Sequence, residues 1–157
     1  SIQAGATFRG IASMNPYDNV GTTRLSTSVS DRLNRIVVDY QDAASEERIV
    51  ALRSGITVEP AERIVPDAVA VTRATRRHPA VRQGSSVRGA IDCALIAAQL
   101  CRLRGVTGAG DERYPQLMFD AMLVALSGRI RLDPEAVLRE IWEDRFVLEP
   151  AAHTGPT

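Results

Sequence analysis

The stretch ASMNPYDNVGT, residues 12–22, decides how the fold of this sequence is interpreted. Residues 8–14 have the pattern of a short strand, and the Asn15-Pro16 pair ends it by turning the chain away. Asn15 therefore stands at the carboxyl end of a predicted strand, where open α/β sheets gather their ligands. Its amide can donate to a phosphate oxygen and accept from an attacking water, whereas an Asn-Pro turn is the structural alternative.

Strand and helix alternate in the residues that follow. A short helix is predicted over 28–33, and Asp31 and Arg35 are spaced for a local i, i+4 ion pair. Residues 36–40 (IVVDY) are a β-branched run suited to a second strand, and a helix over 45–55 opens on a capping serine and ends on a glycine. Two strands are too few for a self-sufficient parallel sheet, so the sequence implies partner strands that it does not contain.

From about residue 59 onward, only helices are predicted. Each of four helices opens on a proline or a capping side chain, and they cover residues 66–77, 86–105, 115–128 and 133–146. The long second helix carries apolar side chains on one predicted face: Val87, Ile91, Leu95 and Ala98. The predicted organisation is thus an α/β portion over 1–58, a helical portion over 59–149 and a disordered tail over 150–157, mostly helical overall.

The composition excludes several functions. The 157 residues include no lysine, so the phosphate-binding P-loop, G-x-x-x-x-G-K-[ST], cannot be present. All 19 basic residues are arginine, which either suits phosphate binding or reflects a GC-rich genome.

Cys93 and Cys101 lie eight residues apart on one predicted helix and cannot bridge each other. We expect both to be buried free thiols of a reducing, cytoplasmic environment.

Nucleic acid, membrane and zinc are not predicted partners. The formal net charge is zero, and no apolar run is long enough to span a bilayer. A basic cluster between Arg73 and Arg82 lacks interleaved aromatic residues, so a solvated face or a subunit contact is favoured over a nucleic-acid surface. His78 and His153 have no cysteine or histidine neighbours at zinc-ligand spacing.

Arg32 is a candidate for phosphate binding across a subunit boundary. It lies beside Asp31 in sequence and faces elsewhere if Asp31 pairs with Arg35. Such a free arginine could act in trans as an arginine finger, which stabilises charge that builds up in phosphoryl transfer. Arg24 is the second choice for this role, and a solvated surface arginine is the alternative interpretation of both.

Arg88 is a candidate for phosphate binding at a helix start. If Ser86 caps the long helix, Arg88 lies in its first turn, where the helix dipole disfavours a cation by about 0.3–1 kcal/mol. A bound anion would remove this conflict, because the helix N–H groups and the guanidinium would both bind it. A contact with Asp92, four residues on, is the alternative.

These motifs, in this order, resemble the second half of an AAA+ ATPase module of the MoxR type. The resemblance rests on MNPYDNVGT at 14–22, SDRL at 30–33 and GSSVRGA at 84–90, with Leu33 and Val87 in place of the usual phenylalanine and proline. It implies the C-terminal part of a P-loop AAA+ α/β core followed by an all-α helical lid. By the resemblance, Asn15 is sensor 1, Arg32 the arginine finger and Arg88 sensor 2.

The resemblance also implies partners and cofactors. The complete module would bind ATP and Mg²⁺ at subunit boundaries of a ring, usually a hexamer, and would remodel client proteins, often with a von Willebrand-type partner. This chain alone is then expected to be inactive, because it encodes neither the phosphate cradle nor the acidic magnesium site. The alternative is a non-enzymatic helical adaptor or oligomerisation module, in which the arginines make protein contacts.

Overall fold

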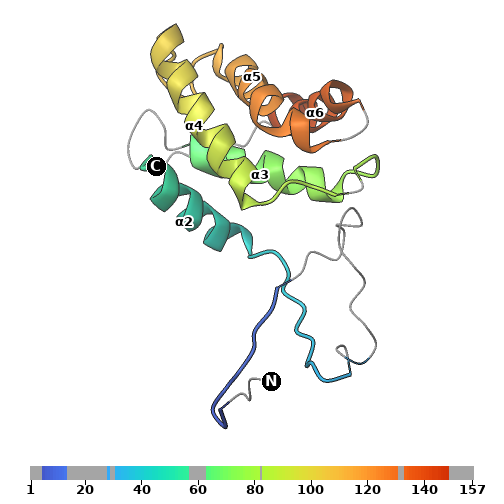
Figure 1. Ribbon diagram of the computed structural model, residues 1–157. Coiled ribbons are helices and arrows are strands. Elements are labelled where there is room, and N and C mark those ends of the chain that lie inside the picture. The colour runs from blue at the N-terminus through green and yellow to red at the C-terminus, as the bar shows by residue number, and fades with distance from the viewer. Residues whose placement is uncertain are drawn as a thin grey trace, which may run out of the picture. The chain divides into compact units, whose positions relative to one another are not determined.

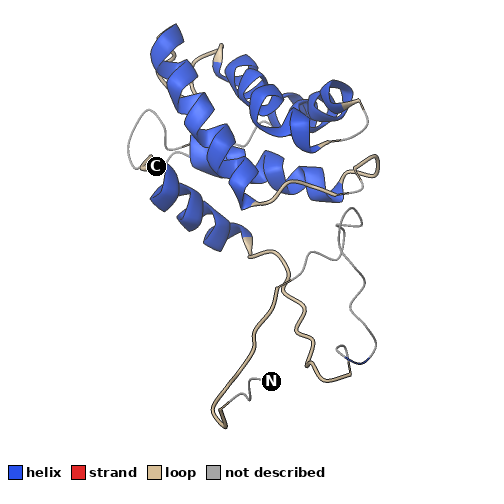
Figure 2. Cartoon of the chain, in the orientation of Figure 1, coloured by secondary structure: helices blue, strands red, loops and turns tan. Residues whose placement is uncertain are grey.

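The computed structural model describes residues 5–13, 28, 31–56, 63–81, 83–130 and 133–148. The chain separates into two units, Ser1–Val38 and Asp39–Thr157. Figure 2 shows helices and loops in the described residues and no strand among them.

In the first unit, neither β-prone run forms a strand. Described residues 5–13 and 31–38 contain only turns, a bend and irregular chain, so the strands predicted over 8–14 and 36–40 are not present there. Ile36, Val37 and Val38 are 84%, 76% and 85% exposed. A strand needs a neighbour to pair its N–H and C=O groups, and the described residues supply none. The α/β part of the predicted fold is therefore not seen in them.

The predicted helix over 28–33 also differs from the structure. Ser28 is helical, but residues 31–33 form a turn and a bend. Within the described part of this unit, no ion pair joins Asp31 to Arg35, and both side chains are exposed. The local spacing alone was not sufficient, because an i, i+4 pair requires a continuous helix to bring the two side chains together.

The second unit is a bundle of helices (Figure 1). Their bounds are as follows: α2 Ala43–Ser54, α3 Ile64–Arg77, α4 Val87–Arg104, α5 Tyr114–Leu126, the 3₁₀ turn η1 Ser127–Arg129, α6 Pro134–Glu143 and the π-helical turn η2 Asp144–Leu148. Helix α4 contacts α2, α3 and α5, and α6 contacts α5 and α3. The helical character predicted for this part of the chain is confirmed.

Local capping chemistry sets the ends of these helices. Gly55 and Gly105 follow α2 and α4 in the left-handed conformation, with φ of 69° and 62°. Asp133 caps α6 by accepting a hydrogen bond of 3.2 Å from the Ala136 amide, and Pro134 follows at the first helical position. At α2 the cap is Asp42, which accepts from the Ser45 amide at 2.8 Å, so the predicted start at Ser45 was wrong.

The core surrounds a face of α4 made of small residues. That face is buried and consists of Gly89, Ala90, Cys93, Ala94, Ala97 and Cys101. The face predicted from hydrophobicity was wrong, since Leu95 is 39% exposed and its predicted companions are only partly buried. Small side chains let three neighbouring helices approach α4 closely, and larger side chains from α3 and α5 then fill the space.

The buried side chains of the core come from every α-helix of the second unit. The largest fully buried apolar residues are Val50, Ile64, Val69, Val71, Leu117, Met118, Met122, Leu126 and Leu138. Cys93 and Cys101 are free and buried, as predicted. Among the described helices, none combines the length and the hydropathy that a bilayer crossing requires.

Candidate functional site

The three predicted site residues lie in different parts of the chain. Asn15 and Arg24 fall outside the described residues. Arg32 lies in the first unit, in an exposed turn, and its guanidinium donates to the carbonyl oxygen of Ser28. Arg88 belongs to the second unit, in the first turn of α4.

Arg88 is an exposed cation with no partner in the described structure. Its side chain makes no hydrogen bond or ion pair with any described residue, and the first turn of α4 contains no acidic residue. Asp92, the alternative partner, binds Arg129 of η1 instead, at 2.5 Å. The N-cap residue Ser86 makes no capping hydrogen bond with its side chain. The start of α4 therefore carries a guanidinium beside the first N–H groups of a helix, the kinds of donor that a phosphate group accepts from.

Ser85, which precedes the N-cap residue Ser86, is held firmly on α3. Ser85 is buried, and its amide donates to the Thr75 hydroxyl at 2.9 Å. Its carbonyl oxygen accepts from Arg76 Nε at 2.7 Å. Both bonds use main-chain atoms of Ser85, so they set the path of the backbone that leads into α4.

Two glycines of the GSSVRGA string serve close packing at this point. A Cβ on Gly84 would overlap the backbone of Arg76. A Cβ on Gly89 would overlap the Ser85 side chain and lie 2.8 Å from a methyl carbon of Leu126. These glycines thus let the loop and the first turn of α4 lie against α3 and α5.

A buried carboxylate of α2 anchors the arginine that binds Ser85. Glu46 is 1% exposed and lies 2.8 Å (Oε1) and 3.1 Å (Oε2) from the two terminal nitrogens of Arg76. The same Oε2 accepts from Arg73 at 2.9 Å. Arg73 and Arg76 therefore form ion pairs within the helical unit, and the solvated face predicted for this cluster is wrong for Arg76, whose side chain is only 10% exposed. Arg82, at its end, lies outside the described residues.

Sequence reasoning missed Glu46 because it reads as a surface residue of an amphipathic helix. Its only signal was its spacing: it lies one turn before Val50, and these two are the buried residues of α2. Charged residues are rarely buried unless they are paired, and the partners here come from 27 and 30 residues away. No local pattern indicates that pairing.

A second buried carboxylate ties α3 to α5 and η2. Asp67 is 1% exposed and accepts from the Tyr114 hydroxyl at 3.0 Å and from Arg145 Nη2 at 2.7 Å. Arg63 contributes a longer contact of 3.3 Å. Burial, followed by the charge of Asp67, raises the pKa of Tyr114 well above its usual value. The hydroxyl is thus a fixed hydrogen-bond donor, not a group that titrates.

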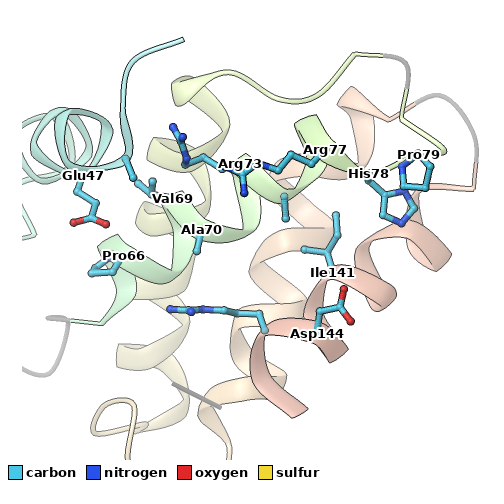
Figure 3. Close-up of a pocket in the computed structure, with 13 residues that line it drawn as sticks. Glu47, Pro66, Val69, Ala70, Arg73, Arg77, His78, Pro79, Ile141 and Asp144 are labelled. Carbon is cyan, nitrogen blue, oxygen red and sulfur yellow. The ribbon is translucent and has the colours of Figure 1, made fainter. Parts of the chain in front are cut away.

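A groove of about 580 Å³ lies along α3, opposite α6 and η2 (Figure 3). Arg73, Arg77 and His78 line one side, and Ile141 and Asp144 face them. His78 Nε2 is engaged by Glu140 at 2.9 Å. The lining carries both signs of charge, and the described residues contain no group of three metal-ligating side chains. In the described part of the chain, Arg88 is the predicted site residue whose exposed guanidinium is available to a phosphate group.

Comparison with known proteins gives one informative similarity. No protein-family model and no solved structure matches the chain. The chain is 31% identical over 140 residues to the gas vesicle ATPase GvpN of Ancylobacter aquaticus. The matched stretch covers 88% of this chain and 36% of that protein, so the chain spans about a third of its relative's length. Together with the motifs, this similarity supports a relationship of the chain to part of an AAA+ ATPase.

Proposed function

We propose that this chain is the sensor- and lid-bearing part of a MoxR-type AAA+ ATPase. The observation that carries the proposal is the exposed side chain of Arg88, which pairs with none of the described residues. It lies in the first turn of α4, and hydrogen bonds to α3 hold the backbone that leads into this turn. The similarity to a gas vesicle ATPase over 88% of the chain supports the same conclusion.

In this proposal, the helical bundle is the lid, and Arg88 binds the phosphates of ATP as sensor 2. Asn15 senses the terminal phosphate, and Arg32 completes the site of a neighbouring subunit in a ring, a hexamer by the resemblance. Contacts that exist with the triphosphate and are lost after hydrolysis would shift the lid between two positions. Turnover needs ATP, Mg²⁺ and a P-loop, and the residues of this chain contain no P-loop motif.

The proposed client is a protein that the ring remodels, with a von Willebrand-type partner. Because the similar protein is a gas vesicle ATPase, a gas vesicle protein is the first client to test. We propose the cytoplasm as the location, on the basis of the two free, buried thiols.

The coding sequence upstream of Ser1 is the first test. An in-frame G-x-x-x-x-G-K-[ST] within about 150–200 codons, an ordinary domain length, would support the proposal. A start codon immediately before Ser1 would contradict it. The protein that contains this motif then allows a direct test: Arg88→Ala should reduce ATP turnover at least tenfold. The matched control is Arg102→Ala, an exposed arginine in the last turn of the same helix, which should leave turnover unchanged.

One observation favours the alternative of a non-enzymatic adaptor. All the buried apolar residues of the described core lie between Val50 and Ile141, so the helical unit builds a core from its own residues. An adaptor of this kind would form a defined oligomer and unfold cooperatively without nucleotide. Unchanged nucleotide binding and turnover in Arg88→Ala, combined with such an oligomer, would favour the adaptor over the ATPase.

A further inference from the structure

Arg76 makes three different contacts from one guanidinium. Its terminal nitrogens bind Glu46, and its Nε donates to the carbonyl oxygen of Ser85 at 2.7 Å. Its central carbon lies 3.9 Å from the centre of the Tyr40 ring. The side chain is only 10% exposed, so these contacts are poorly screened by water. Arg76 thus joins the first residues of the helical unit to Ser85, two residues before α4.

Arg73 strengthens one end of this connection. Its Nη1 donates to the carbonyl oxygen of Gln41 and to Glu46 Oε2, both at 2.9 Å. Residues 40 and 41, which lead into α2, are therefore held to α3 by two arginines. Both arginines depend on the same carboxylate, since Glu46 is the acidic group that both of them contact in the described structure.

The other end of the connection is the start of α4. Ser85 carries the Arg76 bond on its carbonyl group, and its side chain fills the space beside Gly89. Arg88 stands between these two positions in sequence, in the turn whose backbone they set. A shift of Arg76 would therefore move the turn that carries Arg88, although the Thr75 hydroxyl still holds the Ser85 amide.

We propose that Glu46, acting through Arg76, is a positioning residue for Arg88. It holds the guanidinium of Arg76 between Tyr40 and Ser85, so that the first turn of α4 and the segment leading into α2 are set together. The effect on ATP turnover rests on the proposed function, but the effect on the backbone of α4 does not. Glu46 itself does not contact the nucleotide.

Amide hydrogen exchange on the whole chain tests the backbone effect. In Glu46→Gln, which removes the charge and keeps the shape, the Ser85 and Gly89 amides should exchange at least tenfold faster. The Ser85 amide donates to Thr75 Oγ1 of α3, and the Gly89 amide donates to the Ser86 carbonyl at the start of α4. The Val137 amide at the start of α6 is the internal reference and should not change. Glu47→Gln, at the next position of α2, is the matched control variant.

Glu46→Asp covers the case in which Glu46→Gln does not fold. It keeps the charge, but its shorter side chain cannot reach both arginines, so the same amides should exchange faster by a smaller factor. Unchanged exchange at Ser85 and Gly89 in a folded Glu46 variant would overturn the inference.

ATP turnover in the P-loop-containing protein separates this inference from the proposed function. Glu46→Gln should lower turnover, and the double variant with Arg88→Ala should be no slower than Arg88→Ala alone, because both changes act through one group. Arg76→Lys keeps the positive charge but should also lower turnover, since lysine lacks the planar fork that binds Glu46 and Ser85 together. If Arg88→Ala left ATP turnover unchanged, the proposed function would be refuted. The amide exchange rates would then still decide whether Glu46 positions the start of α4. A large effect of Arg88→Ala with none of a folded Glu46→Gln would refute the inference alone.

Discussion

Arg145 of η2 donates from Nη2 to Asp67 of α3 at 2.7 Å, which ties the π-helical turn after α6 to the buried start of α3. The same carboxylate accepts from the hydroxyl of Tyr114, the first residue of α5. One side chain thus fastens three elements that lie far apart in sequence. Removing either partner of such a buried ion pair lowers the free energy of unfolding, because the other group is left inside the protein without a compensating charge.

Asp67→Asn should destabilise the chain by about 3 kcal/mol, because it removes the buried charge that two half-buried arginines, Arg63 and Arg145, share. Urea denaturation followed by circular dichroism measures this loss. The control is Asp92→Asn, which breaks the exposed pair with Arg129 and should cost less than about 1 kcal/mol. Equal losses in the two variants would contradict the role given to Asp67.

Gly89→Ala should destabilise the helical unit by about 1 kcal/mol. Alanine favours a helix over glycine by about 1 kcal/mol, but overpacking costs about 1–3 kcal/mol. The added Cβ would overlap the Ser85 side chain and lie 2.8 Å from a Leu126 methyl carbon. At Gly128, in η1, nothing lies within 4 Å of such a Cβ. Gly128→Ala should therefore keep or raise the thermal midpoint, and a rise with Gly89→Ala would contradict the packing described.

Asp42 should contribute to a loss of stability in acid. Its pKa lies below the ordinary 3.8, mainly because the Ser45 amide and then the Ser45 hydroxyl donate to the carboxylate. A lowered pKa in the folded state stabilises the fold above the unfolded pKa of about 3.9. That stabilisation disappears as the pH falls through the folded-state value.

The matched pair of variants for this prediction is Asp42→Asn and Asp42→Ala. Asparagine caps helices well but does not titrate, so the wild-type chain should lose more stability than Asp42→Asn as the pH falls below about 4. Asp42→Ala should be less stable than both at neutral pH, because α2 then lacks its cap. Denaturation curves over this pH range measure the difference, and parallel curves for wild type and Asp42→Asn would contradict it.

Cys93 should be unreactive in the folded chain. Burial, followed by the charge of Asp67, raises the pKa of its thiol to about 12, whereas only the thiolate attacks a disulfide reagent. Cys101 is also buried, and burial raises its pKa as well. At pH 8, a thiol-titrating reagent should therefore detect almost no cysteine in the native chain and both cysteines in urea. Rapid reaction of one thiol in the native chain would show that α4 opens locally.

Several features of the helical unit follow from local sequence. The Asp133-Pro134 pair starts α6, and Gly55 and Gly105 end α2 and α4. These signals act through the backbone of the same few residues, so they do not depend on the rest of the fold. The free thiols were likewise predictable, because two cysteines eight residues apart on one helix cannot meet.

The strands and the short helix of the first unit were not decided by local sequence. The β-branched run at 36–38 has the composition of a strand, yet it is irregular and exposed. Strand formation depends on a partner that completes the hydrogen bonds, and composition does not supply that partner. The predicted roles of Asn15 and Arg32 stay predictions, the first outside the described residues.

Sequence by itself determined where α2 and α4 end, where α6 begins and which arginine stands at the start of α4. Tertiary structure alone decided which face of α4 is buried and that Glu46 and Asp67 are internal. The reason is physical: a cap acts over three or four residues, whereas burial depends on the fit of neighbouring helices. A carboxylate becomes internal only when arginines from distant turns reach it, here from 27, 30 and 78 residues away.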